Sequence, residues 1–373
     1  MEFEKYPFEK LNELLSDLSP NEEFAPLTLT IGEPQFETPG FIQEELSNNA
    51  HLLNKYPKTA GEMVLKEALL ELVERRFGVK LANEELVLTF GTREALFNFP
   101  QFLLHDKSAP VMAFTNPFYQ IYEGAAIASG AKVLYLDLTK EHDFKPMLDD
   151  RLKAADLVII NSPNNPTASV MSLDELKKWV EAALEWDFVL LNDECYSEIY
   201  TSTPPASLLQ ASIEVGNEDF KNILVVNSIS KRSSAPGLRS GFIAGDGKIL
   251  KEYQRYRTYV GCASPLPLQY AAAVAWKDET HVVENRDRYR KNFKLAHEIL
   301  GVDIPQATFY LWLDVGDDIA FTKEAYERYN IKVLPGSFLG RQGAGKGYVR
   351  VALVYEEKKT KEALERLREV YGR

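Results

Sequence analysis

Lys231 lies in a stretch whose residue types could carry out covalent chemistry. The apolar run 223–226 predicts a buried strand, and directly after it come hydroxyls, one lysine and an arginine. Ser228, Ser230 and Arg239 are the donors that a phosphate needs, because they offer two hydroxyls and a guanidinium fork. A lysine amine beside a phosphate site could form a Schiff base with a phosphorylated aldehyde, pyridoxal phosphate. The alternative for this stretch is a basic loop after a strand.

Polar residues after two other predicted strands suit the same cofactor. Asp193 follows the apolar run 188–191, and a carboxylate buried there needs a partner, which a pyridinium nitrogen would provide. Tyr196 stands three residues after Asp193, and Asn165 follows the apolar run 157–160. Both side chains could donate to the phenolic oxygen of the cofactor ring. The alternatives are an acidic turn with a core tyrosine and an ordinary Asn-Pro turn.

Three further positions could complete such a site. The tripeptide 91–93 opens a predicted helix after a strand, where backbone amides bind phosphate and a glycine allows close approach. Tyr119 could stack on the cofactor ring or fill the core. Arg350 stands in the apolar run 348–353, where it either extends into solvent or forks onto a carboxylate.

Elements that could hold these residues follow one another along most of the chain. Seven short apolar segments, most of them separated by helices, predict a mostly parallel sheet covered by helices on both faces. Polar residues cluster just after these strands, where open α/β sheets place their ligand sites. The segments are 86–90, 111–114, 132–136, 157–160, 188–191, 223–226 and 241–245.

The pattern changes after residue 265 to long helices and a few strands, which predicts a smaller α+β domain. Its expected elements are helices 268–276 and 282–300, strands 309–313, 331–334 and 348–353, and a last helix from 358. We therefore expect three parts. They are an N-terminal segment, 1–40, that joins the small domain, a large cofactor-binding domain, 41–277, and the small C-terminal domain, 278–373.

Composition excludes several classes of function. A net charge of -12 argues against a general binder of nucleic acid or of anionic membranes. The N-terminus is not a signal peptide, and no run is long and apolar enough to span a bilayer. We expect a cytoplasmic protein. Cys195 and Cys262 are isolated and are expected to be buried thiols, and no histidine pairing suggests a metal site or a catalytic triad.

The order of these elements resembles the class I/II aminotransferases, the fold-type-I enzymes that use pyridoxal phosphate. The resemblance covers nearly the whole chain. It is most specific in Asn165-Pro-Thr167, in Asp193-x-x-Tyr196, and in Ser228-x-Ser230-Lys231 with Arg239 eight residues later. It implies that Lys231 forms the Schiff base and moves a proton between the substrate and the cofactor. The catalytic residues would be Lys231, Asp193 and Tyr196.

The resemblance also implies a role for each remaining site residue. Arg350 would bind the α-carboxylate of the substrate, with Asn165 and Gly32 beside it. Tyr56 would reach the phosphate of a neighbouring subunit, so that a homodimer shares its sites. Ala168 stands where the family usually has glycine, and Arg93 where glutamine is common. The cofactor contacts would be Asp193 at the pyridine nitrogen, Tyr196 and Asn165 at the phenolic oxygen, Tyr119 on the ring, and Gly91, Thr92, Arg93, Ser228, Ser230 and Arg239 at the phosphate.

Within the family, the stretches 6–15, 265–269 and 275–289 look like the bacterial N-succinyldiaminopimelate aminotransferases of lysine and cell-wall synthesis. The expected substrates are glutamate, 2-oxoglutarate and the succinylated diaminopimelate precursor. Aspartate, acetylornithine and free LL-diaminopimelate remain open as alternatives. So does a carbon–sulfur β-lyase, whereas the complete set of site residues argues against a non-catalytic ligand sensor. The distal carboxylate could meet Arg93, Arg257 or Arg341.

Overall fold

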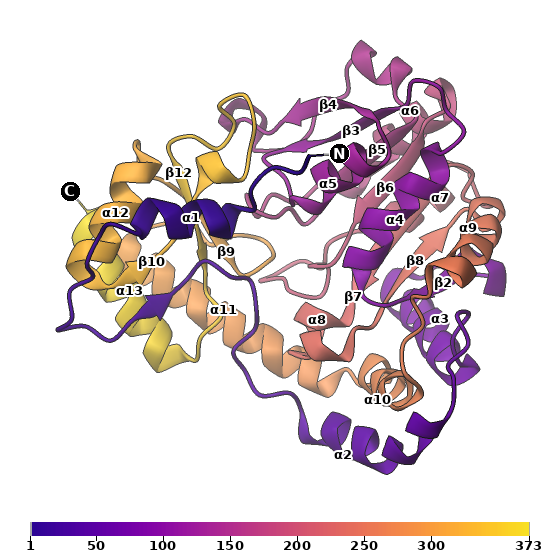
Figure 1. Ribbon diagram of the computed structural model, residues 1–373, viewed down its shortest axis with the longest axis horizontal. Coiled ribbons are helices and arrows are strands. Elements are labelled where there is room, and N and C mark those ends of the chain that lie inside the picture. Colours follow the sequence, from indigo (N-terminus) through magenta and orange to yellow (C-terminus); the bar gives the residue numbers. More distant parts are fainter. Residues whose placement is uncertain (1, 373) are drawn as a thin grey trace.

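A seven-stranded sheet forms the centre of the larger part of the molecule in the computed structural model, which describes residues 2–372 (Figure 1). The strand order is β2-β8-β7-β6-β5-β3-β4. Only β8 runs against its neighbours, β2 and β7. The predicted mostly parallel sheet is therefore confirmed. Its strands are β2 (Leu86–Thr89), β3 (Val111–Asn116), β4 (Lys132–Asp137), β5 (Leu157–Asn161), β6 (Val189–Asp193), β7 (Ile223–Ser228) and β8 (Gly241–Gly245).

Helices cover both faces of this sheet, as predicted. Because successive side chains of a strand point to opposite faces, Val158 and Ile160 of β5 enter one core while Leu157 and Ile159 enter the other. The first core is covered by α2 (Gly40–Asn48), α3 (Met63–Phe77), α6 (Leu173–Trp186), α7 (Leu208–Glu214) and α10 (Leu266–Lys277), and the second by α4 (Thr92–Leu104), α5 (Ile121–Ala128) and α9 (Gly247–Val260).

The C-terminal part is built on a small antiparallel sheet with the order β11-β12-β9. The N-terminal segment packs on it, because Leu27 and Leu29 share a core with Phe293 and Leu311. The boundaries of the three predicted parts, at residues 40 and 277, stay a prediction. The elements here are α1 (Pro7–Leu15), β1 (Leu27–Thr28), α11 (Thr280–Leu300), β9 (Tyr310–Asp314), α12 (Asp318–Tyr329), β10 (Ile331–Lys332), β11 (Leu334–Pro335), β12 (Tyr348–Ala352) and α13 (Glu357–Tyr371).

The single strand expected at 331–334 is divided between two sheets. Ile331 and Lys332 pair in parallel with β1, whereas Leu334 and Pro335 pair with β12 in the three-stranded sheet. An apolar run looks the same whether it pairs along one sheet or crosses to another, so the sequence pattern could not show the division. The helices α7, α9 and α12 were not predicted either.

Among residues 2–372, we find no helix that is both long and apolar enough to cross a membrane.

Candidate active site

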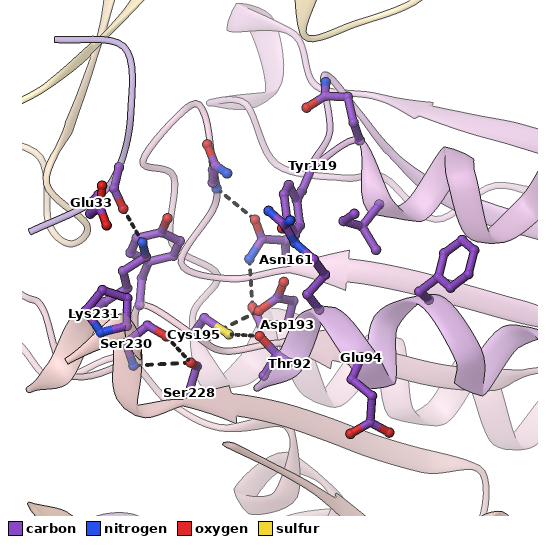
Figure 2. Close-up of a pocket in the computed structure, with 18 of the residues that line it drawn as sticks. Glu33, Thr92, Glu94, Tyr119, Asn161, Asp193, Cys195, Ser228, Ser230 and Lys231 are labelled. Carbon is purple, nitrogen blue, oxygen red and sulfur yellow. Dashed lines mark hydrogen bonds between the residues drawn. The ribbon is translucent and has the colours of Figure 1, made fainter. Parts of the chain in front are cut away.

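A cavity of about 980 Å³ lies at the carboxyl ends of the central strands (Figure 2). Strands β5, β6 and β7, the start of α4 and the N-terminal segment all contribute to its wall, as open parallel sheets predict. Every predicted site residue lines it except Gly91 and Tyr56. The predicted residues that meet here are Gly32, Thr92, Arg93, Tyr119, Asn165, Asp193, Tyr196, Ser228, Ser230, Lys231, Arg239 and Arg350.

Lys231 lies in a short helix, α8 (Ile229–Arg232), that begins directly after β7. The Ser228 side chain caps this helix, because its oxygen accepts from the backbone N–H of Ser230 at 3.2 Å. The amine of Lys231 donates to the backbone carbonyl of Gly32. Burial lowers the pKa of Lys231 to about 8, because the charged amine loses its hydration. A useful fraction of this amine is therefore neutral near physiological pH.

Asp193 ends β6 and is 5% exposed. Its carboxylate accepts from the Tyr122 hydroxyl at 2.8 Å and from the Cys195 amide at 3.2 Å. Burial raises the pKa of Asp193 in spite of both bonds. A carboxylate buried in this way is stabilised by a cationic partner, which the protonated nitrogen of a pyridine ring in the cavity would supply.

Asn165 and Arg350 are directly bonded at the wall of the cavity. The Arg350 guanidinium donates to the side-chain oxygen of Asn165 at 2.7 Å and to the Thr30 carbonyl at 2.6 Å. The side chain of Asn161 fixes the loop that carries Asn165. It accepts from the backbone N–H of Asn165 and donates to the backbone carbonyl of Asp193, both at 2.7 Å. With its oxygen committed to Arg350, the side chain of Asn165 has its amide hydrogens left to offer a ligand.

The cavity wall also contains the groups that a phosphate needs. The Arg239 guanidinium packs directly against the backbone of Gly91. A Cβ at position 91 would lie 2.2 Å from the Nη2 atom of Arg239. Gly91 also has φ +74, a conformation that favours glycine. Thr92 begins α4, and its hydroxyl lies 3.2 Å from the Cys195 sulfur. Helix-terminal amides, hydroxyls and one guanidinium form a donor set that suits a phosphate group.

Tyr196 and Tyr119 bring phenol groups to the cavity from two sides. The Tyr196 hydroxyl lies 3.0 Å from that of Tyr310, and burial raises its pKa well above the usual range. The Tyr119 hydroxyl accepts from Arg93 Nε at 3.0 Å. Both phenols are therefore protonated at neutral pH and can donate hydrogen bonds. By contrast, Tyr56 is fully exposed and lies outside this cavity.

Sequence reasoning missed several residues of this site. Tyr122 lies in the first turn of α5, and no local pattern marked its contact with Asp193, which is 71 positions away. Cys195 was expected to be a buried thiol, but it lines the cavity. Burial and the nearby Asp193 raise the pKa of its thiol, so it is not a thiolate nucleophile at neutral pH. No local pattern marked Asn161.

The residues of the cavity fit pyridoxal phosphate. The set contains the buried amine of Lys231, whose pKa is lowered, and the buried carboxylate of Asp193, whose pKa is raised. It also contains a group of phosphate donors next to Gly91, against which the Arg239 guanidinium packs. A simple basic loop would explain the amine alone.

Comparisons with known proteins agree with this chemistry. Residues 26–367 match the family model for aminotransferase class I and II. The crystal structure of aminotransferase AspB from Helicobacter pylori 26695 superposes with a TM-score of 0.97 at 50% identity, and 100% of each chain is covered. The LL-diaminopimelate aminotransferase of Natranaerobius thermophilus is 31% identical, over 93% of this chain and 92% of the relative. The aspartate aminotransferase of Pyrococcus abyssi is 30% identical, over 92% of this chain and 91% of the relative. The chain therefore belongs to the class I and II aminotransferases, and it is a pyridoxal-phosphate-dependent transaminase of fold type I.

Proposed function

We propose that this aminotransferase moves an amino group from glutamate to the keto precursor of N-succinyl-LL-diaminopimelate, reversibly and in two half-reactions. The observation that carries the proposal is a cavity that presents two guanidinium groups, Arg350 and Arg93, besides the one assigned to the phosphate. Both substrates carry an α-carboxylate and a distal carboxylate. The stretches 6–15, 265–269 and 275–289 favour the succinylated substrate.

Arg93 is the strongest of the three arginines considered for the distal carboxylate. Arg257 is 1% exposed, and its fork is occupied by Glu94, at 2.7 and 2.9 Å. Arg341 is paired with Glu123 at 2.5 Å. Arg93 lines the cavity and is exposed, and among residues 2–372 we find no ion pair for it. An unpaired guanidinium at a cavity wall is suited to a substrate carboxylate.

Roles for the other residues follow from their positions. When bound, pyridoxal phosphate supplies the aldehyde that takes up the amino group and a ring that withdraws electrons. Lys231 then accepts the proton from the substrate α-carbon and returns it, for which a pKa of about 8 is well matched. Asp193 keeps the ring nitrogen protonated. The phenol of Tyr196 and the amide of Asn165 donate to the phenolic oxygen, and Arg350 fixes the α-carboxylate.

The backbone amides of Gly91, Thr92 and Arg93 hold the phosphate in this proposal, together with the side chains of Thr92, Ser228, Ser230 and Arg239. Tyr119 lies on the ring face and Gly32 beside the substrate. We also propose that the enzyme is a cytoplasmic homodimer with three parts, 1–40, 41–277 and 278–373. Tyr56 supports the dimer, because a fully exposed tyrosine is free to enter the site of a second copy. Sedimentation tests the dimer, and a monomer at assay concentrations would contradict it.

An amino-acceptor panel tests the substrate assignment. The purified holoenzyme is first loaded with the amino group from glutamate, which is followed by cofactor absorbance, and is then mixed with keto acids. We expect the succinylated diaminopimelate keto acid to react with the highest kcat/KM. A preference for the free diaminopimelate keto acid or for oxaloacetate would move the assignment to those substrates. Pyruvate and ammonia released from cystathionine without any acceptor would instead indicate a β-lyase.

A further inference from the structure

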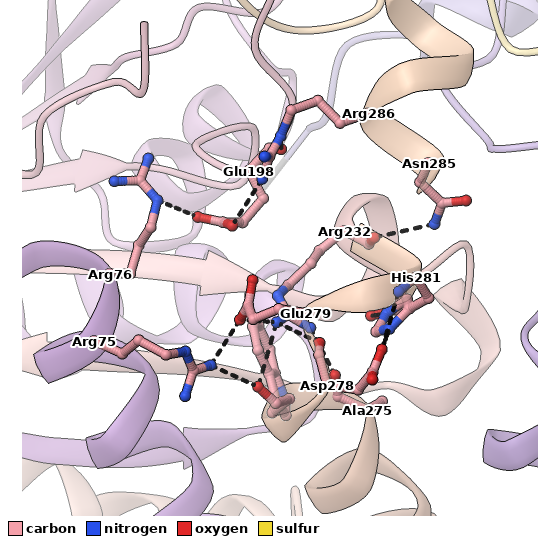
Figure 3. Close-up of polar contacts among 12 residues, drawn as sticks. Arg75, Arg76, Glu198, Arg232, Ala275, Asp278, Glu279, His281, Asn285 and Arg286 are labelled. Carbon is pink, nitrogen blue, oxygen red and sulfur yellow. Dashed lines mark hydrogen bonds and ion pairs between the residues drawn. The ribbon is translucent and has the colours of Figure 1, made fainter. Parts of the chain in front are cut away.

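Arg232 follows Lys231 directly, but its side chain points away from the cavity. The side chain is 1% exposed and reaches the junction between α10 and α11 (Figure 3). Its guanidinium donates to the Ala275 carbonyl at 2.6 Å, the Asp278 carbonyl at 3.0 Å and the Glu279 carboxylate at 2.7 Å. The residue next to Lys231 is therefore anchored to the helices α10 and α11 and not to the cavity.

The acceptors of Arg232 explain why a buried cation is tolerated there. The last carbonyls of α10 have no partner within the helix, and they lie at the negative end of its dipole. The guanidinium donates to three carbonyls, those of Ala275, Trp276 and Asp278, and to the Glu279 carboxylate, and it also lies 5.3 Å from the centre of the Trp276 ring. Removing it would leave the Ala275 and Asp278 carbonyls without this donor, whereas the Trp276 carbonyl and Glu279 would keep Arg75.

Helix α11 holds the same turn from the other side. Asn285 donates to the Arg232 carbonyl at 3.2 Å, and the His281 ring lies 2.8 Å from the Ser233 hydroxyl. Asp278 lies 2.5 Å from the other ring nitrogen of His281. This chain of serine, histidine and aspartate has the contacts of a hydrolytic triad, but Ser233 is 0% exposed and cannot meet a substrate. Its role is to fix the backbone just after Lys231.

The first turns of α11 also contact the segment that carries Tyr196. Arg286 donates to the Glu198 carbonyl at 3.1 Å, and Arg76 of α3 pairs with the Glu198 carboxylate at 2.7 Å (Figure 3). One helix therefore contacts both the turn of Lys231 and the residues just after Tyr196, and from there it continues into the C-terminal core through Phe293.

We propose that Arg232 is a positioning residue for Lys231: its guanidinium ties α8 to the junction of α10 and α11 and so sets where the lysine amine stands. The proposal does not depend on which substrate the enzyme uses. The closest control is Arg75, which lies on α3. It donates to the same Glu279 oxygen at 2.6 Å and to the Trp276 carbonyl at 3.3 Å, but it has no link to Lys231.

The experiment compares the holoenzyme variants Arg232→Met and Arg75→Met. The first readout is the pH midpoint of the cofactor absorbance in the resting enzyme, which reports the surroundings of the lysine amine. We expect Arg232→Met to shift this midpoint and to lower kcat with glutamate by about tenfold to a hundredfold, with KM changed much less, because the lysine is misplaced. Arg75→Met should leave the midpoint and kcat within about twofold of the wild type.

Two milder variants keep the test decisive if Arg232→Met fails to fold. Arg232→Lys retains the charge but not the fork, and should recover part of kcat and of the midpoint. Asn285→Ala removes one bond to the Arg232 backbone and should shift the midpoint in the same direction by less. A folded Arg232→Met enzyme with a wild-type midpoint and kcat would overturn the proposal. An equal effect of Arg75→Met would also overturn it, since the junction would then act through general packing.

Discussion

The guanidinium of Arg350 donates to the side-chain oxygen of Asn165 across 2.7 Å, although 185 positions separate the two residues. Arg350 lies on β12 of the small sheet, and Asn165 follows β5 of the large one. The bond therefore joins the two sheets at the cavity. It also couples the residue proposed for the substrate carboxylate to a residue proposed for the cofactor ring.

Two substitutions at Asn165 should separate these two roles. Asn165→Ala removes the acceptor of Arg350, so we expect KM for glutamate to rise about tenfold as the guanidinium loses its orientation. Asn165→Asp keeps an oxygen for Arg350 but loses the amide donor, so it should disturb the cofactor absorbance more than KM. Steady-state kinetics and absorbance spectra check both. If the two variants had identical effects, Asn165 would not orient the Arg350 guanidinium.

Lys231→Ala should give a folded protein that still binds the cofactor phosphate but transaminates at least about a thousandfold more slowly, because it lacks the proposed proton acceptor. Stopped-flow absorbance with glutamate measures the rate, and circular dichroism confirms the fold. Transamination near the wild-type rate would remove Lys231 from the mechanism.

The lowered pKa of Lys231 also predicts how stability depends on pH in the cofactor-free protein. The folded pKa is about 8, whereas the ordinary value is 10.5, so the unfolded chain binds more protons between these values. Folding is therefore penalised below pH 8, and the penalty disappears as the pH rises to 10.5. Lys231→Met lacks the penalty, so its stability advantage over the wild type should shrink by about 2 kcal/mol from pH 7 to pH 10. Urea unfolding of both proteins at both pH values measures the difference in the free energy of unfolding. A difference that does not change with pH would contradict the lowered pKa of Lys231.

Tyr122→Phe should weaken cofactor binding. Tyr122 donates to Asp193 at 2.8 Å, and losing this bond raises the carboxyl pKa further and weakens the pairing with a cationic ring. We expect the dissociation constant of the cofactor to rise about tenfold, measured by fluorescence titration. Tyr135→Phe is the matched control, because Tyr135 donates to Glu123 at 3.3 Å and does not line the cavity. Equal losses in both variants would point to general packing.

Arg93→Gln tests the assignment of the distal carboxylate. Glutamine has the size of glutamate but an uncharged end, so the ratio of kcat/KM for glutamate to that for glutamine should fall about tenfold in the variant. Arg341→Gln makes the same change at an arginine already paired with Glu123, and its ratio should not move. A falling ratio in Arg341→Gln with none in Arg93→Gln would reverse the assignment.

The sequence predicted the large sheet and most of the cavity because both depend on local patterns. Apolar runs followed by polar residues mark the ends of strands, and parallel strands bring those ends together at one edge, as with Asp193 and Lys231. Pairings between distant segments leave no such pattern. The bond between Asn165 and Arg350 and the division of residues 331–335 between two sheets are of this kind.

Helix α9 and Arg232 were missed for another reason. The buried face of α9 carries Arg257 as well as Leu250 and Tyr253, so its apolar stripe is interrupted by a charge. Arg232 is similar, because a charged residue beside a site is ordinarily expected at the surface. Only the structure shows that Glu94 and Glu279 neutralise these two buried cations.

The contact between Gly91 and Arg239 has a consequence for sequence variation. Any side chain at position 91 would occupy the space of the Arg239 guanidinium, 2.2 Å from its Nη2 atom. A residue other than glycine fits only if the Arg239 side chain moves away from the phosphate donors, and it must still adopt the positive φ of this position. In a saturation library at position 91, we expect every substitution to weaken cofactor binding, because a side chain there displaces the guanidinium proposed for the phosphate and must adopt a positive φ.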